Sequence, residues 1–256
     1  MSSLGDYIDF NNRHIPELDV WSILSEIAQG VKAIHDANII HLDLKPSNIL
    51  IGDSGSIKIG DFGVSVREPV DLDWVKGEGD RRYMAPDLLR DQFHKPADIF
   101  SLGLIVLEMA TGIVLPDTGE PWEELRLADF SGCEEALAKT SRKMRDFIEW
   151  LMQINSRERP TIDQVLAHPE LASRVAKEED DDIRGSNNKG ILFEYVQQVK
   201  SIEQARSPAS SPSSPVLAAL AKIDNALGGA AENDDDDDDD DDDDGELDDD
   251  ENALLH

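Results

Sequence analysis

The chain has 256 residues, 39% of them hydrophobic, a composition that suits one or two domains with a core over part of the length. Its 55 acidic and 24 basic residues give a formal net charge of −31, which disfavours nucleic acid as a partner because phosphates would be repelled. The single cysteine, Cys133, excludes an internal disulfide and fits a reducing compartment.

The first predicted elements are one long helix and a small sheet. Apolar residues recur at helical spacing after Pro16, at Val20, Ile23, Leu24, Ile27, Val31 and Ile34. Three short β-branched runs follow at residues 39–40, 49–51 and 56–59, and the turn-forming residues 52–55 separate the last two. We therefore expect short strands on both sides of a polar loop at residues 41–48.

Helical periodicity returns from Pro96 onward. One apolar stripe comprises Ile99, Leu102, Val106 and Met109, and another comprises Met144, Phe147, Ile148 and Leu151. Thr161 and Gln164 form a capping-box signature for a last short helix that ends near Pro169. The apolar stretch 99–110 is too short to cross a bilayer, so we interpret it as a core helix and expect no membrane partner.

The composition changes after about residue 176. Residues 177–184 are dense in charge, 207–215 are rich in Ser and Pro, and 234–244 are unbroken aspartate. Like charges at this density repel each other and bury no apolar surface, so we expect residues 176–256 to be mostly disordered. Residues 216–227 could form a weak helix. Ser207, Ser211 and Ser214 each precede a proline, the minimal site of proline-directed kinases.

Three motifs in order carry the chemistry. His41-Leu42-Asp43-Leu44-Lys45-Pro46-Ser47-Asn48 is followed by Asp61-Phe62-Gly63 and then by Ala85-Pro86-Asp87. They resemble the catalytic loop, the magnesium-binding Asp-Phe-Gly and the end of the activation segment of protein kinases. The resemblance implies the α+β kinase fold, of which this chain would be the mainly helical C-terminal lobe, at residues 1–175, with a few short strands.

The resemblance also implies ATP and Mg²⁺ as cofactors and a role for each motif residue. Asp43 would orient the substrate hydroxyl and accept its proton, and Lys45 would offset charge on the transferred phosphate. Asn48 and Asp61 would hold Mg²⁺. In a supporting role, Asp98 would bind the catalytic-loop backbone, and Arg159 would pair with Asp87, more loosely than with the usual glutamate. His41 and Phe62 are the other supporting motif residues.

Two departures from the usual kinase pattern narrow the family. Leu42 replaces the arginine that binds a phosphate on the activation loop, and few hydroxyl residues lie in that loop, so activity would not depend on loop phosphorylation. Asp80 replaces a threonine that bonds the catalytic Asp and Lys in serine/threonine kinases. With Glu78-Gly79-Asp80-Arg81-Arg82-Tyr83, Lys95-Pro96-Ala97-Asp98, Leu115-Pro116-Asp117 and Trp122, the chain resembles the Wee family of mitosis-inhibiting kinases.

That resemblance implies inhibitory tyrosine phosphorylation of a cyclin-dependent kinase–cyclin complex, in the nucleus and/or cytoplasm. No Gly-rich phosphate loop and no strand lysine can be placed ahead of the first long helix. We therefore expect this chain by itself to be close to inactive as a kinase. The alternative is a non-catalytic lobe that acts as a binding module for cyclin–kinase complexes.

Overall fold

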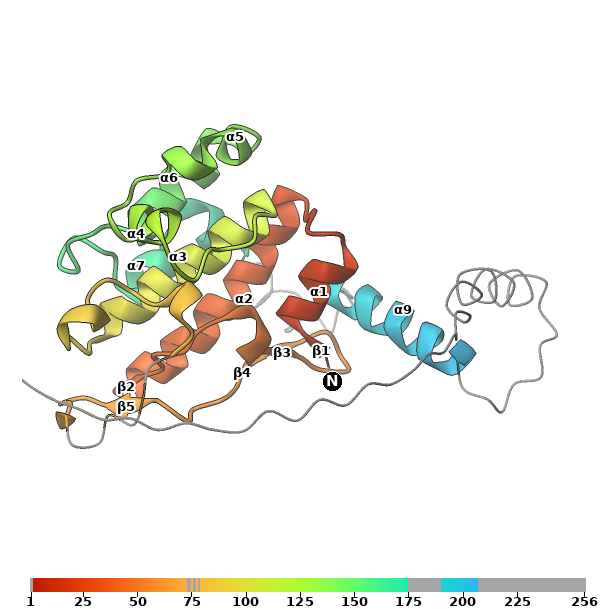
Figure 1. Cartoon of the computed structure of the whole chain (residues 1–256). Coiled ribbons are helices and arrows are strands. Elements are labelled where there is room, and N and C mark those ends of the chain that lie inside the picture. The colour runs from red at the N-terminus through yellow and green to blue at the C-terminus, as the bar shows by residue number, and fades with distance from the viewer. Residues whose placement is uncertain (1, 73–74, 76, 78, 175–189, 207–256) are drawn as a thin grey trace, which may run out of the picture. The chain divides into compact units, whose positions relative to one another are not determined.

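The computed structural model describes residues 2–72, 75, 77, 79–174 and 190–206 (Figure 1). Contacts divide the chain into two units, Met1–Glu203 and Gln204–His256, and the second is described only at residues 204–206. The account below therefore concerns the first unit. The Ser-Pro sites, the weak helix expected at 216–227 and the aspartate run lie outside the described residues.

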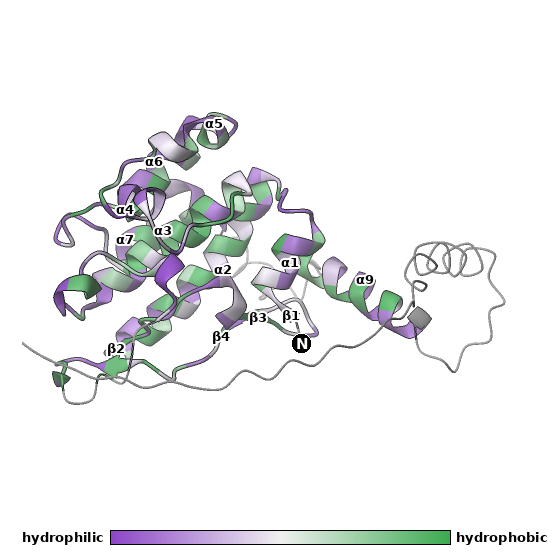
Figure 2. Ribbon diagram, viewed as in Figure 1, coloured by the Kyte–Doolittle hydropathy of each residue, from purple (hydrophilic) through white to green (hydrophobic). Residues whose placement is uncertain are grey.

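Helix α3 (Lys95–Thr111) forms the centre of the lobe. Every residue from Ala97 to Met109 is buried, and Figure 2 shows the helix as mainly hydrophobic. Pro96 sits in the first turn, where a missing N–H costs nothing, and the helix ends at Gly112 with φ +72°. A Cβ at Gly112 would meet the backbone oxygen of Arg13 at 2.2 Å, so only glycine fits this helix end.

Two further helices pack around α3. Helix α2 (Glu17–Asp36) carries the predicted apolar stripe, and α6 (Arg142–Leu151) packs against α3. Trp21 on α2 meets Phe147 on α6 with 4.9 Å between ring centroids, and His168 stacks on Trp21 at 5.7 Å. Shorter helices in this part include α4 (Glu120–Arg126), α5 (Glu134–Leu137) and α7 (Ile162–Leu166), whose capping box joins Thr161 and Gln164.

Two small sheets border the polar loop. The first has the order β1 (Ser2–Ser3), β3 (Ile49–Ile51), β4 (Ile57–Ile59), with antiparallel pairs such as Leu50 with Lys58. The second pairs β2 (Ile39–Ile40) with β5 (Val66–Arg67). Residues 41–48 therefore start from one sheet and end in the other. Their last turn is the 3-10 helix η1 (Pro46–Asn48).

Two helices lie at the ends of the described chain. Helix α1 (Leu4–Phe10) begins at a capping box formed by Ser3 and Asp6. Helix α9 (Ile191–Arg206) falls in the stretch expected to be mostly disordered, and it is a helix that sequence reasoning did not predict. The expected helical lobe with a few short strands is confirmed. No helix among the described residues is both long and apolar enough to cross a membrane.

Candidate active site

Asp98, in the first turn of α3, binds the backbone of the loop that follows β2. One oxygen of this buried carboxylate accepts the backbone N–H of His41 at 2.9 Å, and the other accepts that of Leu42 at 2.9 Å. His35 Nε2 lies 2.9 Å from the same group. Leu42 has φ +66°, a strained value for leucine, and the Asp98 contact holds it there. This is the backbone contact that the motif comparison assigned to Asp98.

The His41 ring joins the loop to the Asp61-Phe62-Gly63 motif. Its Nδ1 lies 3.3 Å from the backbone N–H of Asp43, and its Nε2 lies 3.0 Å from the carbonyl oxygen of Gly60. Only a neutral imidazole that carries its proton on Nε2 satisfies both contacts. The ring also packs against Phe62, with centroids 5.0 Å apart. His41 therefore fixes the spacing between the two motifs.

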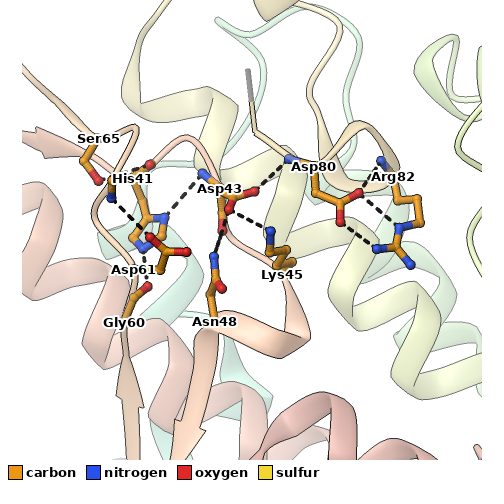
Figure 3. Close-up of polar contacts among 10 residues, drawn as sticks. His41, Asp43, Lys45, Asn48, Gly60, Asp61, Ser65, Asp80 and Arg82 are labelled. Atoms are coloured by element: carbon orange, nitrogen blue, oxygen red, sulfur yellow. Dashed lines mark hydrogen bonds and ion pairs between the residues drawn. The ribbon is translucent and has the colours of Figure 1, made fainter. Parts of the chain in front are cut away.

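Figure 3 shows Asp43 at the centre of the site. One carboxylate oxygen accepts the Asn48 side-chain N–H at 2.9 Å and lies 2.8 Å from Lys45 Nζ. The other accepts the backbone N–H of Asp80 at 2.7 Å. Asn48 also donates to the backbone oxygen of Asp43 at 2.9 Å. Three separate donors thus fix the orientation of this carboxylate, and its side chain is 11% exposed.

Asp80 contacts Asp43 through its backbone N–H and not through its side chain. Both carboxylate oxygens are directed to Arg82, at 3.0 Å from Nε and 2.6 Å from Nη2 (Figure 3). Burial raises the pKa of Asp80, but the Arg82 hydrogen bonds outweigh it and hold the pKa below its ordinary value. The expected threonine-like position is therefore filled by a side chain that caps the 3-10 helix η3 (Arg81–Tyr83).

The segment before η3 passes very close to the catalytic loop. A Cβ on Gly79 would lie 2.4 Å from the backbone oxygen of Leu42 and 3.0 Å from a carboxylate oxygen of Asp43. A side chain at this position would push the two segments apart. Gly79 therefore lets the Asp80 N–H reach Asp43.

The two residues expected to bind Mg²⁺ contribute different groups. Asn48 uses its amide nitrogen on Asp43, so its carbonyl oxygen is the atom that suits a hard cation. Asp61 is exposed, with φ +62°, and one of its oxygens accepts the Gly63 N–H at 3.3 Å. No group of three or more His, Cys, Asp or Glu suited to a metal occurs in the described part of the chain. These residues fit a Mg²⁺ that takes its other ligands from nucleotide phosphates.

Leu42 occupies an apolar cluster instead of a phosphate-binding pocket. It is 6% exposed and packs with Ile40 and Val66, and Val64 and Val70 are among the residues at the edge of this cluster. The first part of the activation segment, around β5, is therefore fixed to the catalytic loop by apolar packing.

Asp87 and Arg159 form a direct ion pair, with Nη1 and Oδ2 2.5 Å apart and both side chains buried. The two groups are close, but within the described residues Asp87 Oδ2 makes no hydrogen bond of normal geometry, so the contact is an ion pair without a directed hydrogen bond. Arg159 also donates to the carbonyl oxygens of Gln153, Ile154 and Pro96, and these contacts hold its guanidinium against the shorter acid. Burial raises the pKa of Asp87, but contacts with His94 and Arg159 outweigh it and lower the pKa below its ordinary value.

Comparison with known proteins agrees with this geometry. Residues 1–171 match the protein kinase domain family. The chain is 51% identical over 131 residues to mitosis inhibitor protein kinase SWE1 of Candida albicans, which covers 50% of this chain and 11% of that protein. It is 41% identical over 177 residues to mitosis inhibitor protein kinase wee1 of Schizosaccharomyces pombe, 61% of this chain and 20% of that protein.

The chain belongs to the Wee-type protein kinases. It is also 42% identical over 174 residues to the membrane-associated tyrosine- and threonine-specific cdc2-inhibitory kinase of Drosophila melanogaster, 66% of this chain and 31% of that protein. The Wee-type chain thus spans between about a tenth and a third of the length of these relatives.

Two contact networks in this Wee-type kinase escaped sequence reasoning. In the first, Trp122 Nε1 on α4 donates to Arg81 O at 2.8 Å, and buried Arg126 donates to the carbonyl oxygens of Arg81, Arg82 and Met84. Burial, together with the positive charge of Arg81, lowers the pKa of Arg126 to about 9. Only Trp122 stood out in the sequence, as part of the family likeness. Helix α4 therefore holds η3 through its backbone carbonyl oxygens.

In the second network, Glu108 on α3 connects Arg13, just after α1, with Tyr83 in η3. One of its oxygens accepts Arg13 Nη2, and the other accepts the Tyr83 hydroxyl. Burial, followed by the charge of Glu108, raises the pKa of Tyr83, so its hydroxyl remains a donor. An acid inside the apolar stretch 99–110 was the one available signal, because buried acids need partners.

Proposed function

We propose that this chain is the catalytic and substrate-binding lobe of an ATP- and Mg²⁺-dependent kinase that phosphorylates an inhibitory tyrosine of a cyclin-dependent kinase–cyclin complex. The observation that carries the proposal is the Asp43 carboxylate, held by Asn48, Lys45 and the Asp80 N–H. Such fixed geometry is what in-line phosphoryl transfer requires, because catalysis here is mostly positioning and charge stabilisation.

Each residue has a defined task in this proposal. ATP supplies the phosphoryl group, and Mg²⁺ neutralises the charge on its oxygens. Asp43 would align the substrate hydroxyl and accept its proton as the hydroxyl oxygen bonds to the γ-phosphorus and the bond from that phosphorus to the bridging oxygen breaks, with ADP as the leaving group. Lys45, whose side chain is 21% exposed and lies 2.8 Å from Asp43, would offset the negative charge on the transferred phosphate. Asn48 and Asp61 are the residues that would hold Mg²⁺, through their side-chain oxygens.

The choice of tyrosine is supported by the conformation at Asp80. Its side chain is engaged by Arg82, so no side chain at position 80 hydrogen-bonds Asp43 or Lys45 as the serine/threonine pattern would require. Two relatives are named as mitosis inhibitors, and a third as a tyrosine- and threonine-specific cdc2-inhibitory kinase. Those names support a cell-cycle substrate. We propose that the kinase meets this substrate in the nucleus and/or cytoplasm.

Control by loop phosphorylation is not expected for this kinase. Leu42 fills the position of the phosphate-binding arginine, and its apolar cluster already joins the activation segment to the catalytic loop. We expect phosphatase treatment to leave activity unchanged if that segment is the only phosphorylated region.

The first test is Asp43→Asn, measured in the protein that carries this chain together with an ATP-binding lobe. General-base and positioning roles are typically worth about 10²–10⁴ in rate, so we expect a loss of that size with an unchanged fold by circular dichroism. A matched control is Asp146→Asn, an exposed aspartate on α6 whose only ion pair among the described residues is with the exposed Arg142. Turnover that survives Asp43→Asn within about threefold would remove Asp43 from this role.

The second test is phosphoamino-acid analysis of a cyclin–kinase substrate. We expect phosphotyrosine. Phosphoserine and phosphothreonine alone would contradict the Wee-type substrate and leave the kinase activity standing. The chain of 256 residues, assayed alone beside the longer protein, separates the alternatives: we expect little turnover from it, and Asp43-dependent turnover with micromolar ATP affinity would show that this lobe suffices.

A further inference from the structure

Helix α9 lies outside the residues that match the protein kinase domain, yet it is part of the folded lobe. Leu192, Tyr195 and Val196 are 2%, 5% and 6% exposed and belong to the main hydrophobic core. Figure 2 shows both hydrophobic and hydrophilic residues along α9, and Gln197 and Gln198, next to the buried residues in the chain, are exposed, as expected of a helix with one buried face. Its docking is therefore specific, and it adds a component that the family domain does not include.

The buried face of α9 contacts α1 through Tyr195. The Tyr195 ring meets those of Tyr7 and Phe10 edge to face, with centroids 5.1 Å apart in both pairs. At the β3–β4 turn, a Cβ on Gly55 would lie 2.5 Å from the backbone nitrogen of Phe193, so helix and turn are in direct contact. Lys200 adds an ion pair with Asp53 at 3.1 Å.

Helix α1 in turn touches the active site at both ends. At its start, a Cβ on Gly5 would be in ordinary contact with the backbone of Ser47 in η1, at 3.7 Å. Just beyond its end, Arg13 donates to Gly112 O, Ile113 O and Glu108, the acid that also accepts the Tyr83 hydroxyl. Arg13 has φ +59°, a value that persists only where such contacts hold it.

We propose that α9 is a positioning helix for the active site, with Tyr195 as its central positioning residue. Helix α1 has seven residues, too few to be stable without tertiary packing. Docked α9 holds α1 in place. Helix α1 in turn positions η1, which carries Asn48, and the Arg13 side chain that binds Glu108. Glu108 then positions Tyr83, and with it η3, next to the catalytic loop. Tyr195 touches none of the reacting groups, so its effect is indirect.

The test compares variants of the full chain by hydrogen exchange and, in the protein that also carries an ATP-binding lobe, by steady-state kinetics. With Tyr195→Ala we expect about tenfold faster exchange at the Arg13 and Asn48 amides, which now bond Ile8 O and Lys45 O. We expect kcat to fall about threefold to tenfold, with KM for the substrate nearly unchanged, because positioning and not binding is lost. Tyr195→Phe keeps the ring and should restore both.

A second pair of variants approaches the same contact from the other side. Gly55→Ala should displace the first turn of α9 and reproduce the exchange pattern of Tyr195→Ala. Gly55 has φ +84°, so alanine there is also strained, and Gly119→Ala at φ +80° is the matched control for strain because its nearest atom is 3.9 Å away. We expect Gly119→Ala to leave exchange at Arg13 and Asn48 unchanged.

Each outcome decides the proposal. Faster exchange confined to α9, or an unchanged kcat in Tyr195→Ala and Gly55→Ala, would overturn it. Should Tyr195→Ala unfold the lobe, Tyr195→Leu keeps an apolar side chain at the buried position and is read in the same way. The kinetic part rests on the proposed kinase function. Hydrogen exchange can be measured without turnover. If the wild type is inactive but Tyr195→Ala still speeds exchange at the Arg13 and Asn48 amides, the proposed kinase function is overturned and the positioning role of α9 stands.

Discussion

Gly79→Ala is the sharpest test of how this site is assembled. The new Cβ would lie 2.4 Å from Leu42 O, 3.0 Å from a carboxylate oxygen of Asp43 and 3.3 Å from Asp43 Cα. Leu42 cannot move away easily, because its backbone N–H is bound to Asp98. The segment that carries Gly79 and Asp80 must shift instead, and it takes with it the 2.7 Å hydrogen bond from Asp80 to Asp43.

The size of the effect follows from these contacts. Loss of one preorganised contact to a reacting group typically costs about 10²–10³ in kcat. Overpacking of this kind lowers the free energy of unfolding by about 1–3 kcal/mol. Both would be measured, kcat by phosphate transfer to a cyclin–kinase substrate and stability by urea unfolding.

Gly190→Ala is the matched control, because no atom lies within 4 Å of a Cβ at Gly190. We expect it to behave as the wild type in both assays. A Gly79→Ala enzyme that keeps kcat within about threefold of the wild type would refute the reasoning, since the clash would then be absorbed without loss of the Asp43 contact.

Other predictions concern stability and control. Asp87→Ala leaves Arg159 buried without its acid and should cost about 3–5 kcal/mol in urea unfolding. Because folding lowers the Asp87 pKa, the contribution of Asp87 to the free energy of unfolding is full above its ordinary pKa near 4. That contribution is lost as the pH falls through the lowered pKa, so Asp87→Asn should make stability depend less on pH in this acidic range. Leu42→Arg should destabilise by several kcal/mol and Leu42→Met by less than about 1.5. Phosphate on Ser207, next after α9, should weaken its C-terminal end by about 0.3–1 kcal/mol, seen as faster exchange there.

Local patterns were enough to predict much of the lobe. The apolar periods of α2, α3 and α6 depend on 3.6-residue spacing, which neighbouring residues determine by themselves. The catalytic residues were equally visible, because Asp43, Lys45 and Asn48 lie within six positions and their chemistry restricts the residue types. The same reasoning did not predict α9, although Leu192, Tyr195, Val196 and Val199 have helical spacing, because charged and Ser/Pro-rich segments surround it.

The sequence by itself determined the catalytic motifs, the family and the helical character of the lobe, since each is written in short stretches of neighbouring residues. Only the tertiary structure decided which distant groups meet. Arg13 finds Glu108 95 positions away, and Asp80 reaches Asp43 through its backbone while its side chain turns to Arg82. Such contacts depend on how packed helices bring backbone and side chains together, and a backbone donor such as the Asp80 N–H is the same in every residue except proline.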